Sequence, residues 1–248
     1  MTLLPAAVLF DMDGLLVDTE RTWFAVETEV MTALGGPWGH EHQAALVGSP
    51  MEHSAQYMLD LSGRADVSVQ DVSRSLLDGM VTQLRRGPVD WMPGAQRLLD
   101  AVAAAGTPRA LVSSSSRVLV DAVLDAVGCE HFDVTVSGDD VVRTKPHPDP
   151  YLLAADLLGV AASTCVAIED SRPGASSARA AGCLTIVVPS VTPVPEDTAD
   201  LQVSSLEAVD LTVLGRLMGS RKPVCPPARG IRTRDVRDDR YGAVHDHR

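Results

Sequence analysis

The chain of 248 residues carries 33 Asp and Glu against 21 Lys and Arg, a formal net charge of −12. Its 45% share of hydrophobic residues and 22% share of charged residues are typical of a globular protein and exclude wholesale disorder. The net negative charge disfavours general nucleic-acid binding, which depends on clustered Lys and Arg. A small phosphorylated ligand stays compatible with it, because a local site can be positive inside an acidic protein.

No stretch of the sequence matches a membrane-spanning helix, which needs about 20 mostly apolar residues. The first apolar run ends at Asp11 with no basic region before it, so we expect no signal peptide. The four cysteines show no CxxC spacing, which indicates free thiols in a reducing compartment. We therefore expect a cytoplasmic protein, a monomer or weak homodimer, with neither membrane nor nucleic acid as a partner.

Five short apolar runs are predicted to be β-strands, at residues 6–10, 109–112, 132–136, 165–168 and 184–188. Most are continuously apolar rather than alternating, which is typical of parallel strands covered on both faces. Helical patterns lie between the later runs, at residues 95–105, 118–127, 150–158 and 174–181. This alternation predicts an α/β fold with a doubly wound parallel sheet.

The interval between the first two predicted strands is unusually long. It covers about 90 residues, whereas a single crossover helix needs about a dozen or somewhat more. Helical patterns occupy 19–34, 51–61 and 69–86, and no run there is typical of a strand. We predict a small all-helical cap domain at residues 18–88, inserted after the first strand, with the core domain formed by residues 1–17 and 89–215.

The C-terminal segment differs in composition from the rest. Residues 216–248 hold nine Lys and Arg against four Asp and Glu, with three prolines and little apolar periodicity. These features predict a disordered basic tail.

The first chemical motif is Asp11-Met12-Asp13-Gly14, directly after a predicted buried strand. In an extended chain, residues two apart point to the same side, so Asp11 and Asp13 converge at the carboxyl end of the strand. Two close carboxylates repel unless a proton or a cation lies between them, and Mg²⁺ is the natural cation for oxygen ligands. An acidic surface turn or a helix cap is the alternative.

A run of four serines, residues 113–116, follows the second predicted strand. A hydroxyl and free backbone N–H groups before a helix can bind an anion, which makes Ser113 and Ser114 candidate phosphate ligands. Ordinary capping of the helix by one of the serines is the alternative.

Lys145 lies in a proline-rich segment, with Pro146, Pro148 and Pro150 close behind it. Proline restricts both its own backbone and that of the preceding residue, so the segment is a stiff mount for one cation. Such a lysine can neutralise a phosphate or an acidic nucleophile. A solvated lysine in a proline-rich loop is the alternative.

Glu169 and Asp170 follow the fourth predicted strand, again ahead of a helix. Asp170 can complete a cation site begun by Asp11 and Asp13, although capping of the helix by Asp170 or Ser171 is equally compatible. Because all four motifs follow parallel strands, we expect them at one edge of the sheet. Together they form a phosphoryl-transfer constellation of carboxylates, hydroxyl, lysine and metal ligands.

This ordered set resembles the haloacid dehalogenase superfamily of phosphohydrolases. The resemblance covers about residues 5–210, and the segment 11–20 is similar to the subfamily of β-phosphoglucomutases and sugar-phosphate phosphatases, which has a helical cap after the first motif. The superfamily implies a Mg²⁺-dependent phosphatase of small phosphate monoesters, with an aspartyl-phosphate intermediate.

The resemblance also implies a role for each motif residue. Asp11 is the nucleophile and Asp13 the general acid and base. Ser113, the backbone of Ser114 and Lys145 bind the phosphoryl group. Mg²⁺ is held by Asp11, Asp170 and the backbone carbonyl of Asp13, with support from Glu169.

The cap leaves the substrate open. Gly48, Ser49 and Met51 are candidate substrate contacts. The mutase has a histidine where this chain has Trp23. Phosphatases of the group often have a tryptophan at that position, as this chain does, although they also have a proline where it has Arg21. We therefore favour a phosphatase that acts on sugar or polyol phosphates over a phosphosugar mutase. A receiver-type signalling module and a non-catalytic phospholigand-binding protein are more distant alternatives, disfavoured by the insert and by the intact Asp11 and Asp13.

Overall fold

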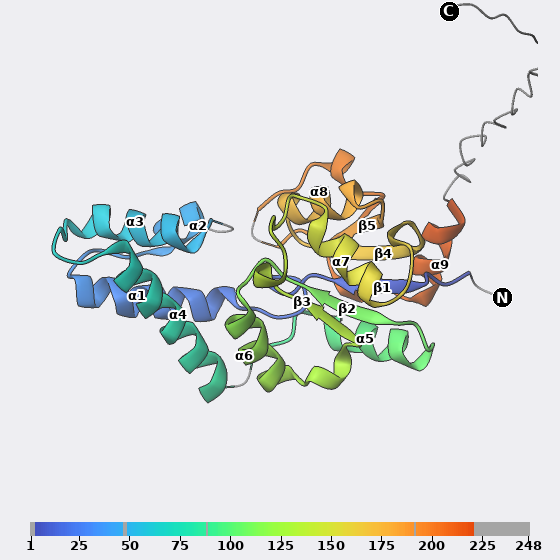
Figure 1. The fold of residues 1–248 in the computed structure, drawn as a ribbon, viewed down its shortest axis with the longest axis horizontal. Helices are drawn as coiled ribbons and strands as arrows, with labels where there is room; N and C mark the ends of the chain where they lie inside the picture. The colour runs from blue at the N-terminus through green and yellow to red at the C-terminus, as the bar shows by residue number, and fades with distance from the viewer. Residues whose placement is uncertain (1–2, 47–48, 88, 191, 221–248) are drawn as a thin grey trace, which may run out of the picture.

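The computed structural model describes residues 3–46, 49–87, 89–190 and 192–220, and it contains one six-stranded parallel sheet (Figure 1). The strand order is β3-β2-β1-β4-β5-β6. The strands are β1 (Ala7–Phe10), β2 (Arg109–Val112), β3 (Val134–Val136), β4 (Cys165–Glu169), β5 (Leu184–Val187) and β6 (Leu201–Gln202). The predicted doubly wound α/β fold is confirmed. The sixth strand was not expected, because two residues are too few to form an apolar run.

Helices cover both faces of the sheet, which explains why the strands are continuously apolar. All four residues of β1 are buried. Ala7 and Leu9 pack with α7 (Asp149–Leu157) and α8 (Arg172–Ala180). Val8 and Phe10 belong to the apolar cluster that includes α5 (Ala95–Ala104), α6 (Arg117–Val127) and α9 (Leu211–Ser220). Successive side chains thus point into opposite layers, and the strand residues that face both layers are mostly apolar, with the buried Thr185 of β5 as a polar exception.

Four helices fill most of the long interval after β1 and lie together at one side of the sheet (Figure 1). They are α1 (Glu20–Leu34), α2 (His40–Leu46), α3 (Met51–Ser62) and α4 (Val69–Arg86). Their buried side chains, such as Met31, Met58 and Met80, belong to the same apolar cluster as Val8 and Phe10 of β1. The short helix α2 was not expected, because Leu46 is its only buried residue and leaves no periodic pattern. The division into separate domains stays a prediction.

The two connections between these helices and the sheet run side by side. The backbone N–H of Asp18 donates to the carbonyl of Asp90 at 2.9 Å, and that of Met92 donates to Leu16 at 2.8 Å. Val17 also forms a β-bridge with Trp91. The chain therefore leaves and re-joins the sheet through one paired ribbon, which holds the start of α1 close to the end of β1.

The disordered tail was predicted to begin at residue 216, which is too early. Residues 216–220 belong to α9, in which Leu214 and Leu217 are buried at helical spacing. Composition averaged over the tail concealed this last apolar stripe. Residues 221–248 lie outside the described residues. None of the described helices has the length and apolarity that crossing a membrane requires.

Glu27 on α1 is expected to make stability depend on pH. Its side chain is buried, and no described residue hydrogen-bonds to its Oε2. Burial, with the charge of Glu20 second, raises the pKa of Glu27 from 4.5 to about 7. The folded state therefore binds this proton more tightly than the unfolded state. Its contribution to stability is complete below pH 4.5 and is lost as the pH rises through 7.

Glu27→Gln is therefore expected to flatten the loss of stability between pH 5 and pH 8. The upper limit of the effect is about 3 kcal/mol. Chemical denaturation of both proteins at the two pH values measures it, with Glu29→Gln, an exposed site on the same helix, as the control. An unchanged pH dependence in Glu27→Gln would contradict the assignment.

Candidate active site

The motifs meet because their strands are neighbours. Strand β1, which precedes Asp11 and Asp13, lies between β2, which precedes Ser113, and β4, which ends at Glu169. The backbone N–H of Asp11 donates to Ile168, and the register pairs Phe10 with Leu111 and Ile168. The site thus lies at the carboxyl edge of the sheet, between connections that run to its two halves, where α/β sheets bind ligands.

Lys145 is the cation at the centre of the site. Only 4% of its side chain is exposed. Its Nζ lies 2.5 Å from Oδ1 of Asp11 and 2.6 Å from Oε1 of Glu169, and donates to the carbonyl of Val112 at 2.9 Å. Burial alone lowers the pKa of Lys145, but the carboxylates of Asp11 and Glu169 outweigh burial and raise it above its usual range. Lys145 is therefore charged.

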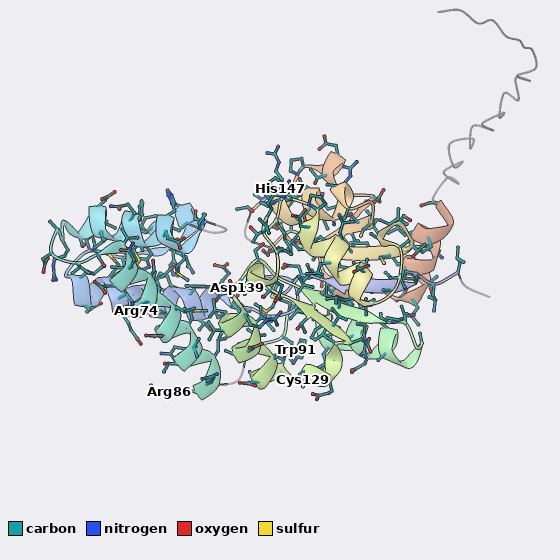
Figure 2. All side chains as sticks on the ribbon, viewed as in Figure 1. Arg74, Arg86, Trp91, Cys129, Asp139 and His147 are labelled. Carbon is teal, nitrogen blue, oxygen red and sulfur yellow. The ribbon has the colours of Figure 1, made fainter. Side chains whose placement is uncertain are left out.

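The loop that carries Lys145 is anchored on both sides. Ser177 of α8 donates to the carbonyl of His147, a residue labelled in Figure 2. Arg143 binds Asp149 through two hydrogen bonds of 3.0 Å. The contact of the buried Ser177, rather than the prolines alone, holds the lysine in place, whereas the Arg143 pair lies at the surface.

Three carboxylates surround a possible cation position. One oxygen each from Asp11, Glu169 and Asp170 lies within 4.8 Å of the others. Burial first, and neighbouring acids after it, raise the pKa of Asp11 well above its usual value, although Lys145 opposes the shift. Burial and Glu169 raise the pKa of Asp170 to about 7. The group thus carries more negative charge than Lys145 neutralises.

Glu169 is fully buried and held from several directions. Tyr151 donates its hydroxyl to Oε1 at 2.5 Å, and Ser171 donates to Oε2 at 3.2 Å. Gly174 packs directly against the carboxylate, since a Cβ there would lie 1.9 Å from Oε2. The sequence analysis did not identify Tyr151 or Gly174 as partners of Glu169. Tyr151 lies on a different helix, and Gly174 looks like an ordinary residue in the first turn of α8.

The side chain of Asp13 faces hydroxyl groups and not the cluster formed by Asp11, Glu169 and Asp170. Thr19 donates to its Oδ1 at 2.8 Å. Ser115 and Ser113 donate to its Oδ2 at 2.9 and 3.4 Å. The Asp13 side chain is therefore separate from the three-carboxylate group, and the predicted metal contact through its backbone carbonyl stays a prediction. Thr19 and Ser115 were missed, although the four-serine run was a signal for the latter.

Gly14 permits the turn between Asp11 and the helices. Its φ of +77° lies in the left-handed region, and a Cβ would lie 2.5 Å from Oδ2 of Asp170. Ser190 donates to that same oxygen at 2.6 Å. The backbone of the first motif thus packs directly against the side chain of the fourth.

The remaining candidates are placed less centrally. Ser114 is exposed and its carbonyl packs against Gly138. The backbone N–H of Ser49 donates to the carbonyl of Leu46. Among the described residues, no hydrogen bond links Ser49 to the three carboxylates. Gly48 lies outside the described residues. Trp23 packs against the apolar cluster, so the start of α1 reaches Asp13 through Thr19 instead.

Such a lysine, carboxylate pair and acidic cluster at one sheet edge define a class of enzyme, the phosphoric monoester hydrolases. The family model of the haloacid dehalogenase-like hydrolases matches residues 8–188, and the chain belongs to this family. The superfamily and enzyme class predicted from the motifs are both confirmed.

Similar proteins cover more than four fifths of the chain. Protein CbbY of Rhodobacter capsulatus is 33% identical over 213 residues, which are 82% of this chain and 94% of CbbY. Hexitol phosphatase A of Escherichia coli is 32% identical over 216 residues, 82% of this chain and 93% of that enzyme. The crystal structure of a CbbY mutant from Rhodobacter sphaeroides in complex with xylulose-(1,5)bisphosphate has a TM-score of 0.72 at 29% identity, covering 83% of this chain and 96% of that one.

Proposed function

We propose that the protein is a Mg²⁺-dependent phosphatase that hydrolyses small sugar or polyol phosphates through an aspartyl phosphate on Asp11. The observation that carries the proposal is the buried Lys145, which contacts both Asp11 and Glu169 beside the separately held Asp13. This arrangement supports one carboxylate as the nucleophile and a second as the group that transfers protons, which two-step phosphoryl transfer requires.

The acidic group fits Mg²⁺. Octahedral Mg²⁺ binds oxygens at about 2.1 Å, so opposite ligands are about 4.2 Å apart. The spread of 4.8 Å among the oxygens of Asp11, Glu169 and Asp170 needs only a small contraction. Burial first, and neighbouring carboxylates after it, raise the pKa values of Asp11 and Asp170, and a bound cation would offset both effects. When bound, the ion would neutralise charge on the phosphoryl oxygens.

The chain's own residues account for the remaining chemistry. In the first step Asp11 attacks phosphorus, and Asp13 gives a proton to the departing alcohol oxygen. In the second step Asp13 takes a proton from water, which attacks the aspartyl phosphate and releases phosphate. Ser113, the backbone of Ser114 and Lys145 hold the phosphoryl oxygens. The hydroxyls of Thr19 and Ser115 hold Asp13 in reach of both steps.

The substrate class rests on the relatives. Hexitol phosphatase A is named for a polyol phosphate, and the similar crystal structure holds a sugar bisphosphate. Both ligands are short carbon chains with several hydroxyls. We infer that the helices after β1 cover the substrate as a cap, with Gly48, Ser49 and Met51 near its hydroxyl-bearing end.

Phosphate release from a panel of sugar and polyol phosphates, with Mg²⁺ and with excess chelator, tests the proposal. We expect turnover with Mg²⁺ and none with chelator. Asp170→Asn is expected to raise the Mg²⁺ concentration needed for half-maximal rate by about tenfold or more. Undiminished activity in chelator would contradict the metal role. Conversion of β-glucose 1-phosphate to glucose 6-phosphate, faster than phosphate release, would replace the phosphatase with a mutase.

A further inference from the structure

We infer that this enzyme selects substrates by charge: it accepts phosphate monoesters whose other groups are neutral hydroxyls and rejects those that carry a second phosphate. The inference rests on the proposed function and adds to it the nature of the far end of the substrate. It is carried by Glu20, by its neighbours on α1 and α2, and by the charges of the helices around them.

Glu20 lies at the start of α1, next to the residue that touches Asp13. Thr19 donates to Oδ1 of Asp13 at 2.8 Å, so the first turn of α1 borders Asp13, the proposed proton donor to the departing oxygen. From α2, Gln43 donates to the carbonyl of Glu20 at 2.8 Å and to its Oε2 at 3.4 Å. These bonds tie α2 to this turn and orient the carboxylate.

The other carboxylate oxygen of Glu20 is unused. None of the hydrogen bonds within the described part of the chain reaches its Oε1, and the side chain is only half-buried. A carboxylate oxygen accepts hydrogen bonds and donates none when ionised. Oε1 of Glu20 is therefore suited to a substrate hydroxyl and unsuited to a phosphate oxygen.

The field around this turn is negative. Glu20 follows Thr19, which hydrogen-bonds to Asp13, and lies two residues after Asp18; burial first, then the charges of Asp13 and Asp18, raise the pKa of Glu20. A second phosphate near this turn would add further negative charge to the same region, and like charges in a poorly solvated site repel strongly.

The helices that border Glu20 supply no fixed cation. The sequence has no Lys or Arg between Arg21 and Arg64, a stretch that includes all of α2 and α3. Arg21 itself is 81% exposed and pairs with Asp18 and Asp90 at 3.3 and 3.7 Å. Binding of a second phosphate usually depends on Arg or Lys donors, and Arg21, which α1 does offer, is already paired with two acids at the surface.

The histidines of α2 are engaged within the helices. The ring of His40 stacks on Phe24 with centroids 4.0 Å apart. Nδ1 of His42 lies 2.9 Å from the hydroxyl of Tyr57, and its ring stacks on Trp38. On the sheet side, Lys145 already serves Asp11 and the reacting phosphoryl group. The far end of the substrate therefore meets acceptors and neutral groups.

The test compares matched substrates with Mg²⁺ in excess. Glucose 1-phosphate is paired with glucose 1,6-bisphosphate, and fructose 1-phosphate with fructose 1,6-bisphosphate. We expect kcat/KM for the better monophosphate to exceed that of its bisphosphate by at least about tenfold. Raising the salt concentration from 20 to 300 mM is expected to narrow the ratio, because salt screens the repulsion.

Glu20→Gln keeps the shape of the side chain and removes its charge. We expect this variant to lower the ratio by about fivefold, through faster bisphosphate turnover and slower monophosphate turnover. Glu52→Gln, an exposed acid at the start of α3, changes the net charge equally and is expected to leave the ratio unchanged. Circular dichroism confirms that each variant is folded.

The outcomes separate the two proposals. If no pair releases phosphate with Mg²⁺, the phosphatase itself is contradicted and charge selection falls with it. If phosphate is released but the bisphosphates are cleaved as fast as the monophosphates, only charge selection is overturned. The same conclusion follows if the salt concentration and Glu20→Gln both leave the ratio unchanged.

Discussion

Replacing Asp11 by Asn is expected to abolish phosphate release while the protein stays folded. The amide has nearly the same shape, but it is not an anion and cannot attack phosphorus. Loss of a covalent nucleophile costs several orders of magnitude, so we expect kcat to fall by about 10⁴-fold or more. Phosphate release and the thermal unfolding midpoint of the same preparation measure the two parts of the prediction.

Asp156→Asn is the matched control, because Asp156 lies exposed on α7. It makes the same chemical change at an exposed position on a helix that covers the sheet, so we expect both phosphate release and the thermal unfolding midpoint to stay unchanged. Labelling with a ³²P-containing substrate should mark wild-type protein transiently and leave Asp11→Asn unmarked. A folded Asp11→Asn protein with wild-type turnover would eliminate the proposed covalent mechanism.

Replacing Lys145 by Met is expected to damage stability and activity together. Methionine fills similar space but leaves Asp11 and Glu169 as buried carboxylates without their cation. Removing one partner of a buried ion pair costs about 3–5 kcal/mol. Chemical denaturation measures the loss in stability. We expect the loss to be smaller at pH 5 than at pH 8, because unpaired buried carboxylates have raised pKa values and take up protons as the pH falls.

Arg143→Met provides the comparison from the same loop. Arg143 pairs with Asp149 at the surface, where its side chain is 58% exposed, and exposed pairs contribute about 0–1 kcal/mol. We expect this variant to retain most of its stability and activity. If Lys145→Met were as stable and active as Arg143→Met, the lysine would not hold the charges at the centre of the site.

The arrangement of the sheet could be predicted from the sequence because burial acts on short segments. Strands such as β1 and β4 are covered on both faces, so their residues are apolar up to Glu169 at the end of β4, and the run is visible without a structure. The polar residues that follow each strand stand out for the same reason. The elements that escaped prediction, α2 and β6, bury one or two residues and leave no such pattern.

The limits of the C-terminal region show how local composition can mislead. Basic residues and prolines after Gly215 outweighed the apolar spacing of Leu214 and Leu217, which continues α9 to Ser220. A stripe of two buried residues is too weak to compete with composition over 33 residues. The packing of Leu214 and Leu217 against the core shows that the helix continues to Ser220.

The sequence by itself determined which residues are candidates for the chemistry: Asp11, Asp13, Ser113, Glu169 and Asp170 stand at the ends of recognisable strands, and Lys145 stands in a proline-rich segment. Their partners were decided by the tertiary structure alone. Thr19 reaches Asp13 only because the paired ribbon returns α1 to the end of β1. Tyr151 reaches Glu169 only because α7 packs over the sheet. No periodicity in the sequence records such contacts, even where the partners are 6 or 18 residues apart, because hydrogen bonds and ion pairs depend on distances that folding alone establishes.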